Sequence, residues 1–105
     1  MSLTEEVPDL QADDWIAVDI GSTWSPGQFV QFDQELEELE VNFLHRSPSN
    51  EKWFVWPSLQ TNGKEDKGWI EEKRVFYRLN EPVEGRREVL MFNEYEDVEK
   101  AFLEL

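Results

Sequence analysis

Aromatic rings and carboxylates are the side chains of this sequence with the most evident chemistry. The 105 residues include five Trp, seven Phe and two Tyr, together with 24 Asp and Glu. A cation is attracted both to the face of a ring and to a carboxylate. Trp24 and Trp53 lie beside turns, where a ring is least committed to a core. The composition therefore indicates a site for a positively charged ligand.

The sequence lacks the residues that most catalytic and metal-binding sites need. There is no Cys, which excludes a thiol nucleophile, a thiolate metal site and a disulfide framework. The single His45 leaves zinc with too few nitrogen ligands, and Gly21-Ser22 lacks the pattern of a serine nucleophile. No glycine-rich phosphate-binding motif occurs. We expect a non-enzymatic binding domain with no cofactor and no metal.

Charge is distributed unevenly along the chain. The formal net charge is −14, and residues 1–45 contain eleven acids with no Lys or Arg. A field of this sign repels nucleic acid, whose binding rests on Lys and Arg, and attracts basic proteins. We therefore expect a basic protein or peptide as the partner, rather than nucleic acid. A plainer interpretation is that the acids keep a small, aromatic-rich domain soluble.

The Lys and Arg residues all lie after position 45, and some of them could form a local basic patch. Its candidate members are Lys64, Lys67, Lys73, Arg74, Arg78, Arg86 and Arg87.

No apolar run approaches the roughly 20 residues that cross a membrane. Residues 1–10 carry acids where a signal peptide has its basic region. We expect an intracellular protein without a membrane partner, and a nuclear one if its ligand belongs to chromatin.

Short segments of β-forming residues separated by turns predict a mainly β domain. Five strands are expected, at residues 15–20, 28–33, 39–43, 53–57 and 74–79. The glutamates of residues 35–40 have helical propensity, but the alternation that follows them favours a hairpin loop. Residues 69–73 suggest one helical turn, and residues 89–92 a short extended segment.

The two ends of the chain carry different patterns. Residues 1–13 lack periodicity and predict a flexible acidic lead-in, with Leu10 packed on the domain. Residues 60–68 are polar and predict a loop. Asn93 followed by Glu96 predicts a helix start with a capping box. The apolar stripe of that helix consists of Tyr95, Val98, Phe102 and Leu105.

The predicted strands resemble the Tudor group of SH3-like barrels. The resemblance rests on Trp15-Ile16-Ala17-Val18, Trp24-Ser25-Pro26-Gly27-Gln28-Phe29-Val30 and Leu39-Glu40-Val41-Asn42-Phe43-Leu44. Phe54-Val55-Trp56-Pro57 and the strand near Val75 are similar to C-terminal barrel domains of uncharacterised proteins of mobile-element origin. The resemblance covers residues 14–79. It implies a small five-stranded SH3-like (Tudor-like) barrel there, with a loop and a C-terminal α-helix packed on it at residues 80–105.

Tudor-like domains hold methylated Lys or Arg in an aromatic cage, and the resemblance implies a cage here. In relatives with a cage, the residue before the Pro of the second strand is aromatic, whereas here it is Ser25, with Trp24 one place earlier. A shift of one place turns a strand side chain to the opposite face. Trp24 is therefore either a displaced cage wall or a core residue. The candidate ligand-binding residues are Trp24, Phe43, Trp53, Asp13, Asp14 and Asp19.

Several of these rings also have a structural explanation. Phe43 fits the core as well as a cage, and Trp53 could close the site from the next loop. Trp15 and Trp56 are expected in the core, because rings of this size bury large areas. Trp69 is expected to pack against the long loop or the C-terminal helix.

Three functions remain open at this point. A protein-interaction module for a basic peptide, with methylated Lys or Arg as one form of the ligand, predicts Trp24, Trp53 and neighbouring acids on one exposed concave face. An acidic inhibitor or nucleic-acid mimic, which would occupy a partner's basic cleft, predicts rows of acids and no aromatic groove. A scaffold or oligomerisation domain predicts docking through the C-terminal helix.

Overall fold

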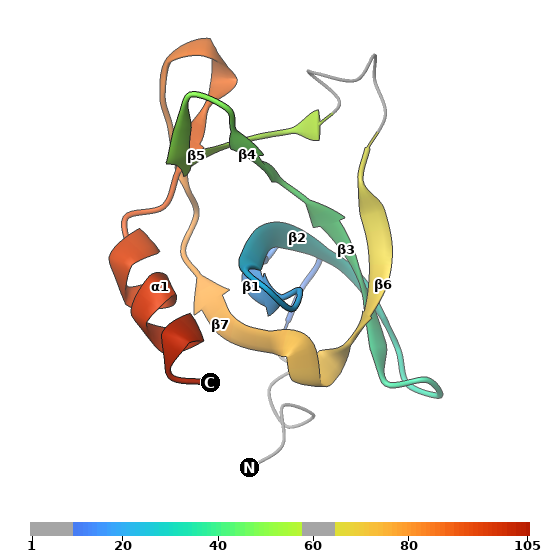
Figure 1. The fold of residues 1–105 in the computed structure, drawn as a ribbon. Coiled ribbons are helices and arrows are strands. Elements are labelled where there is room, and N and C mark those ends of the chain that lie inside the picture. Colours follow the sequence, from blue (N-terminus) through green and yellow to red (C-terminus); the bar gives the residue numbers. More distant parts are fainter. Residues whose placement is uncertain (1–9, 58–64) are drawn as a thin grey trace.

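The computed structural model describes residues 10–57 and 65–105, which form two antiparallel β-sheets and a C-terminal α-helix (Figure 1). The five-stranded sheet has the order β6-β3-β2-β1-β7. Its strands are β1 (Trp15–Asp19), β2 (Trp24–Asp33), β3 (Glu38–Phe43), β6 (Lys67–Glu71) and β7 (Val75–Leu79). The predicted mainly β fold with one helix at the C-terminal end is confirmed.

A second sheet, formed in part by the predicted strand at residues 53–57 and the predicted extended segment at residues 89–92, accompanies the first. It has the order β4-β5-β9-β8. Its strands are β4 (His45–Ser47), β5 (Asn50–Val55), β8 (Val83–Glu84) and β9 (Leu90–Met91). The fourth predicted strand thus belongs to this second sheet. β8 and β9 pair with each other, and β9 pairs with β5. Residues after position 79 therefore complete the sheet that β4 and β5 begin.

The place of the fourth strand in the first sheet is taken by β6, where a helical turn was expected. Trp69 lies opposite Glu40 of β3, and Ile70 packs on the core, so side chains alternate as in a half-buried strand. The helical turn follows as a short 3₁₀ segment, η4 (Glu72–Arg74), which leads into β7. The glutamate-rich segment forms the expected hairpin turn between β2 and β3.

The first sheet is buried on both faces at β1, where successive side chains point to opposite sides. Ile16 and Val18 belong to one apolar cluster and Ala17 to another, and all three are fully buried. The cluster on the side of Ala17 contains Trp24, Leu44, Phe54, Leu79, Phe92, Tyr95 and Val98. Trp15 and Trp56 pack against this cluster with ring centroids 5.7 Å apart, as expected.

Helix α1 (Tyr95–Leu103) lies against β7 and closes the cluster that contains Ala17 (Figure 1). Tyr95 and Val98 are buried as predicted, whereas Leu105 is exposed. The predicted capping box is wrong: the helix starts at Tyr95, and its N-cap residue makes no side-chain capping bond. Glu96 instead forms an ion pair with Lys52 of β5, with 2.6 Å between Oε1 and Nζ.

The described part of the predicted lead-in is held on the first sheet. Leu10 packs on the cluster that contains Ile16, as expected, and the backbone N–H of Asp13 donates to the carbonyl oxygen of Phe29 at 2.9 Å. Residues 1–9, and residues 60–64 of the predicted loop, lie outside the described residues. Within the described ranges, no helix is long and apolar enough to cross a membrane.

A close approach between β2 and β3 at Gly27 leaves no room for a side chain. A Cβ at Gly27 would lie 2.5 Å from Val41 Cγ1 and 2.9 Å from the carbonyl oxygen of Asn42. Gly27→Ala should therefore lower the free energy of unfolding by about 3 kcal/mol. Gly68→Ala is the matched control, because a Cβ there meets only Phe43 Cε2 at 3.8 Å. Urea titration measures both; equal midpoints for the two variants would contradict this close approach.

Candidate functional site

An aromatic cage is present, and it holds a side chain of the protein itself. The guanidinium carbon of Arg46, on β4, lies 5.0 Å from the ring centroid of Trp24 and 5.1 Å from that of Phe54. The third ring is Tyr95 of α1, with its centroid at 5.8 Å. A cation within about 6 Å of a ring centroid is attracted by the negative face of the ring. We call these three rings and their cation the Arg46 cage.

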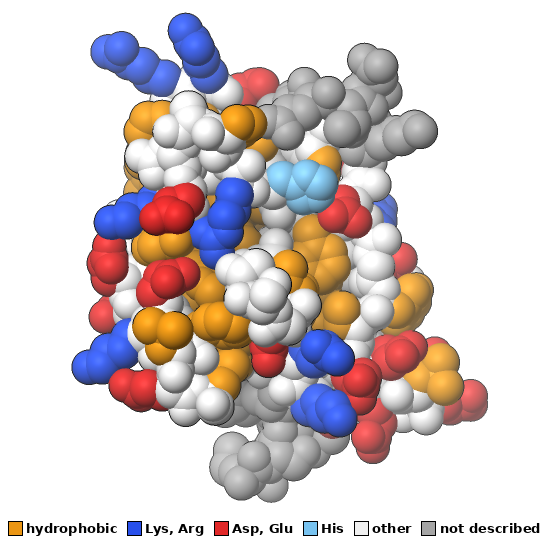
Figure 2. Space-filling model, in the orientation of Figure 1, with side chains coloured by type: hydrophobic (Ala, Val, Ile, Leu, Met, Phe, Trp, Pro, Cys, Tyr) orange, Lys and Arg blue, Asp and Glu red, His pale blue; other side chains and the backbone are white. Residues whose placement is uncertain are grey.

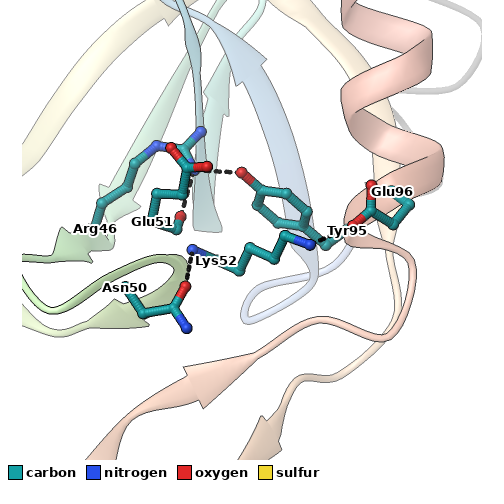
Figure 3. A network of polar contacts seen from close by, with 6 residues as sticks. All are labelled: Arg46, Asn50, Glu51, Lys52, Tyr95 and Glu96. Carbon is teal, nitrogen blue, oxygen red and sulfur yellow. Dashed lines mark hydrogen bonds and ion pairs between the residues drawn. The ribbon is translucent and has the colours of Figure 1, made fainter.

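Directional hydrogen bonds hold Arg46 in this cage, and Figure 3 draws those to Glu51 and Tyr95. Its Nη1 donates to the carbonyl oxygen of Glu51 at 2.7 Å and to the hydroxyl of Tyr95 at 3.0 Å. Its Nη2 donates to the carbonyl oxygen of Trp24 at 3.1 Å. The planar fork of an arginine suits such a set of acceptors better than the point charge of a lysine. The half-buried cation is therefore compensated within the protein.

The phenol of Tyr95 lies near two cations, Arg46 and Lys52, and its pKa is shifted mainly by burial. Lys52 Nζ lies 5.9 Å from the Tyr95 ring centroid, alongside the ring whose hydroxyl meets Arg46 (Figure 3). Burial raises the pKa of Tyr95, and the charge of Arg46 opposes this rise. The phenol is consequently neutral at physiological pH and accepts the Arg46 hydrogen bond.

Trp24 was expected either as an exposed ligand-binding wall or as a core residue. The structure buries it, so the first of these roles is wrong. Only 1% of the residue is exposed, and its ring faces Phe54 and Tyr95 in the core. The indole Nε1 donates to Glu99 Oε1 of α1 at 2.7 Å. Trp24 thus serves the Arg46 cage and the helix, and it has no free face for an external ligand.

Two further candidates also have structural roles. Phe43 is half-buried and packs against the apolar cluster of Ile16, on the other side of the sheet from Trp24. Asp19 ends β1, and its Oδ1 accepts the backbone N–H of Gly21 at 2.8 Å in the following turn. The predicted residues Trp24, Phe43 and Trp53 therefore do not form a common cage.

The acids Asp13 and Asp14 do share a cleft. It has a volume of about 420 Å³, and its lining is Asp13, Asp14, Trp15, Gln28, Leu79, Asn80 and Glu81. Asp14 Oδ2 accepts a hydrogen bond from Arg78 Nη2 at 2.9 Å, so an arginine of the protein already neutralises one carboxylate. We call this feature the acidic cleft.

A larger and more apolar groove contains Trp53. It has a volume of about 680 Å³ and lies between the β4–β5 and β8–β9 hairpins. Its lining is Ser47, Ser49, Trp53, Val55, Gly85, Arg86, Arg87, Val89 and Met91. Trp53 is 37% exposed, and Phe54, the next residue of β5, is fully buried in the core. Alternation along β5 therefore directs Trp53 outward into this feature, which we call the Trp53 groove.

Two arginines provide the only charges among the described residues that line the Trp53 groove. Arg86 and Arg87 are exposed, and neither has an ion-pair partner among the described residues. They lie in the 3₁₀ segment η5 (Arg86–Glu88), where Arg87 and Glu88 have φ values of 56° and 61°. Each left-handed residue costs roughly 1–2 kcal/mol. The protein therefore keeps two available cations on a strained turn beside an apolar groove.

The other predicted members of a basic patch are engaged elsewhere. Lys67 pairs with Glu65, Lys73 and Arg74 lie near Glu71, and Arg78 pairs with Asp14. Lys64 lies outside the described residues. Among the predicted members that the structure describes, only Arg86 and Arg87 are thus without an ion pair.

Some residues of these sites escaped the sequence analysis. Arg46 is the first Lys or Arg in the sequence and lies two positions after the apolar Leu44, which the structure buries fully; this alternation is the one local signal for a buried cation. Nothing local joins it to Tyr95, 49 positions away. Trp69, expected against the loop or helix, is instead 46% exposed on the edge strand β6.

Comparisons with protein-family models, with curated proteins and with solved structures found no match. The resemblance to Tudor-like domains therefore stays a prediction. Among the residues that the structure describes, no group of three or more His, Asp and Glu is arranged to hold a metal ion.

The Arg46 cage generates a second prediction, on stability. Arg46→Ala should lower the free energy of unfolding by about 3 kcal/mol, because it removes a compensated, half-buried cation and leaves its acceptors unpaired. Arg46→Lys keeps the charge but loses the fork, and should recover only part of this loss. Lys52→Ala is the matched control on the same ring: its ion pair with Glu96 is exposed and should cost less than about 1 kcal/mol. Denaturant titration of the three variants measures the order, and a lysine variant as stable as the parent would contradict it.

Proposed function

We propose that this domain is a non-enzymatic protein-interaction module that binds a short peptide segment in the Trp53 groove. The observation that carries the proposal is the combination of an exposed Trp53 with two arginines, which form no ion pair with the described residues, around an open apolar groove of about 680 Å³. Trp and Arg are the residues most enriched among those that dominate binding energy at protein interfaces.

The chemistry of the lining favours a ligand with an apolar side chain next to acidic ones. Val55, Val89 and Met91 offer aliphatic surface beside the Trp53 ring. Arg86 and Arg87 can each bind a carboxylate with two parallel hydrogen bonds. The ligand that fits the groove is therefore an acidic segment with an aliphatic residue, whereas the composition alone predicts a basic one.

A peptide fits better than a nucleic acid. Binding to a phosphate backbone depends on several Lys and Arg contacts, and two arginines stand at this groove. A formal net charge of −14 repels a polyanion along its whole length. A segment with one or two acids meets this repulsion over a much shorter stretch.

The acidic cleft supports a second candidate function, the binding of a basic peptide. Asp13 and Glu81 line it together with Asp14 and the partly buried ring of Trp15. A Lys or Arg side chain, methylated or not, would meet carboxylates and one ring edge there. A nuclear location with a chromatin protein as the partner belongs to this second candidate.

The third prediction tests the Trp53 groove with a synthetic peptide that has one leucine between glutamates. Trp53→Ala should weaken binding of this peptide by about 1 to 3 kcal/mol, because it removes the aromatic wall. Trp69→Ala is the matched control, since Trp69 is an exposed ring on the other sheet. Calorimetric titration measures the affinities, and methyl NMR of Met91 reports whether the groove is the site.

The same titration separates the alternatives. A peptide with lysines in place of the glutamates should bind the groove more weakly than the acidic peptide. Stronger binding of the lysine peptide, with loss on Asp13→Asn and Asp14→Asn, would transfer the function to the acidic cleft. Binding of single-stranded DNA that requires Arg86 and Arg87 would replace the peptide proposal.

A further inference from the structure

The turn between β2 and β3 has the chemistry of the ligand that the Trp53 groove would take. Leu36 stands in this turn with 65% of its surface exposed. Residues 34–37 are all exposed, and four of the six residues at positions 33–38 are acidic. We call residues 33–38 the acidic turn. Figure 2 shows acidic side chains gathered over this corner of the molecule.

The acidic turn is held in one conformation by its own hydrogen bonds. Asp33 Oδ1 accepts the backbone N–H groups of Glu35 at 2.9 Å and of Leu36 at 3.3 Å. The carbonyl oxygen of Glu37 accepts the backbone N–H of Glu72 at 3.0 Å, which ties the turn to η4. A segment that is already ordered loses little conformational entropy on binding. The exposed leucine is thus presented on a fixed support.

The Trp53 groove and the acidic turn lie at different ends of the molecule. The β8–β9 hairpin, which carries Arg86 and Arg87, is at one end, and the β2–β3 turn is at the other (Figure 1). Basic side chains project from the first end and acidic ones surround the second (Figure 2). A molecule therefore cannot place its own turn in its own groove, but two molecules in line can make this contact.

We propose that the Trp53 groove of one copy receives the acidic turn of a second copy, so that the domain associates head to tail. This inference rests on the proposed function, for which it names the partner. Leu36 would enter the apolar part of the groove, while Glu35 and Glu37 would meet Arg86 and Arg87. The contact joins two different surfaces, so each added copy leaves one groove and one turn free, and association does not end at a dimer.

Sedimentation of the full chain over a wide concentration range, at physiological salt, tests the proposal. Salt of this strength screens the overall repulsion of the negative chains beyond about 8 Å. The weight-average mass should rise continuously with concentration and pass the mass of a dimer. Leu36→Asp should weaken association by at least about tenfold, because it removes the apolar side chain that would enter the groove. The fold should be kept, because Leu36 is an exposed turn residue. Leu103→Asp is the matched control, because Leu103 is exposed at the end of α1.

A mixture of two variants gives the decisive result. Leu36→Asp keeps the groove, and the double variant Arg86→Glu with Arg87→Glu keeps the turn. Each alone should remain monomeric, and a mixture should form a complex of one copy of each and nothing larger. A parent chain that stays monomeric, or association that survives Leu36→Asp, would overturn head-to-tail assembly. The Trp53 groove would still bind the synthetic acidic peptide in that case, so failure of this inference is distinct from failure of the proposed function.

Discussion

The Arg46 cation is the constraint on which the rest of the domain depends. A guanidinium that is half removed from water needs acceptors and ring faces around it, and these come from three separate elements. Trp24 is on β2, Glu51 and Phe54 are on β5, and Tyr95 is on α1. The cation therefore joins the first sheet, the second sheet and the helix at one point. The hydrogen bonds and ring contacts of Arg46 thus fix how these three elements lie relative to one another.

This use of a cation inside the protein determines what remains outside for a partner. The rings that a cation-binding domain would offer to a ligand are occupied by Arg46, and the carboxylate of Asp14 is occupied by Arg78. Trp53 lies on the opposite face of β5 from Phe54, beside two arginines that form no ion pair within the described part of the chain. Trp24 and Asp14 of the predicted site are thus engaged within the protein, whereas the groove beside Trp53 is open at the surface.

Local patterns in the sequence predicted elements better than they predicted the site. The alternation at Leu39 and Val41 and the helical spacing of Tyr95 and Val98 each express burial of one face, and both features are present. The predicted helix start was wrong, and Glu96 forms an ion pair with Lys52 of β5 in place of a capping bond. The helical turn predicted at residues 69–73 was wrong in part, because β6 pairs with β3. Such choices depend on partners that are distant in the chain. The composition of the aromatic cage is a choice of this kind, which explains why only Trp24 among its three rings was a predicted cage residue and why Arg46 was not predicted as its cation.

The most direct test of this account is an NMR measurement on the Arg46 side chain. A guanidinium enclosed by the rings of Trp24, Phe54 and Tyr95 should show side-chain protons shifted strongly upfield by ring currents. Its Nη protons should exchange slowly, because they are bonded to Glu51, Trp24 and Tyr95. Addition of a trimethyllysine peptide should leave these resonances and the Trp24 indole resonance unchanged. Arg46 shifts like those of a free arginine, or displacement of Arg46 by the methylated peptide, would contradict the account.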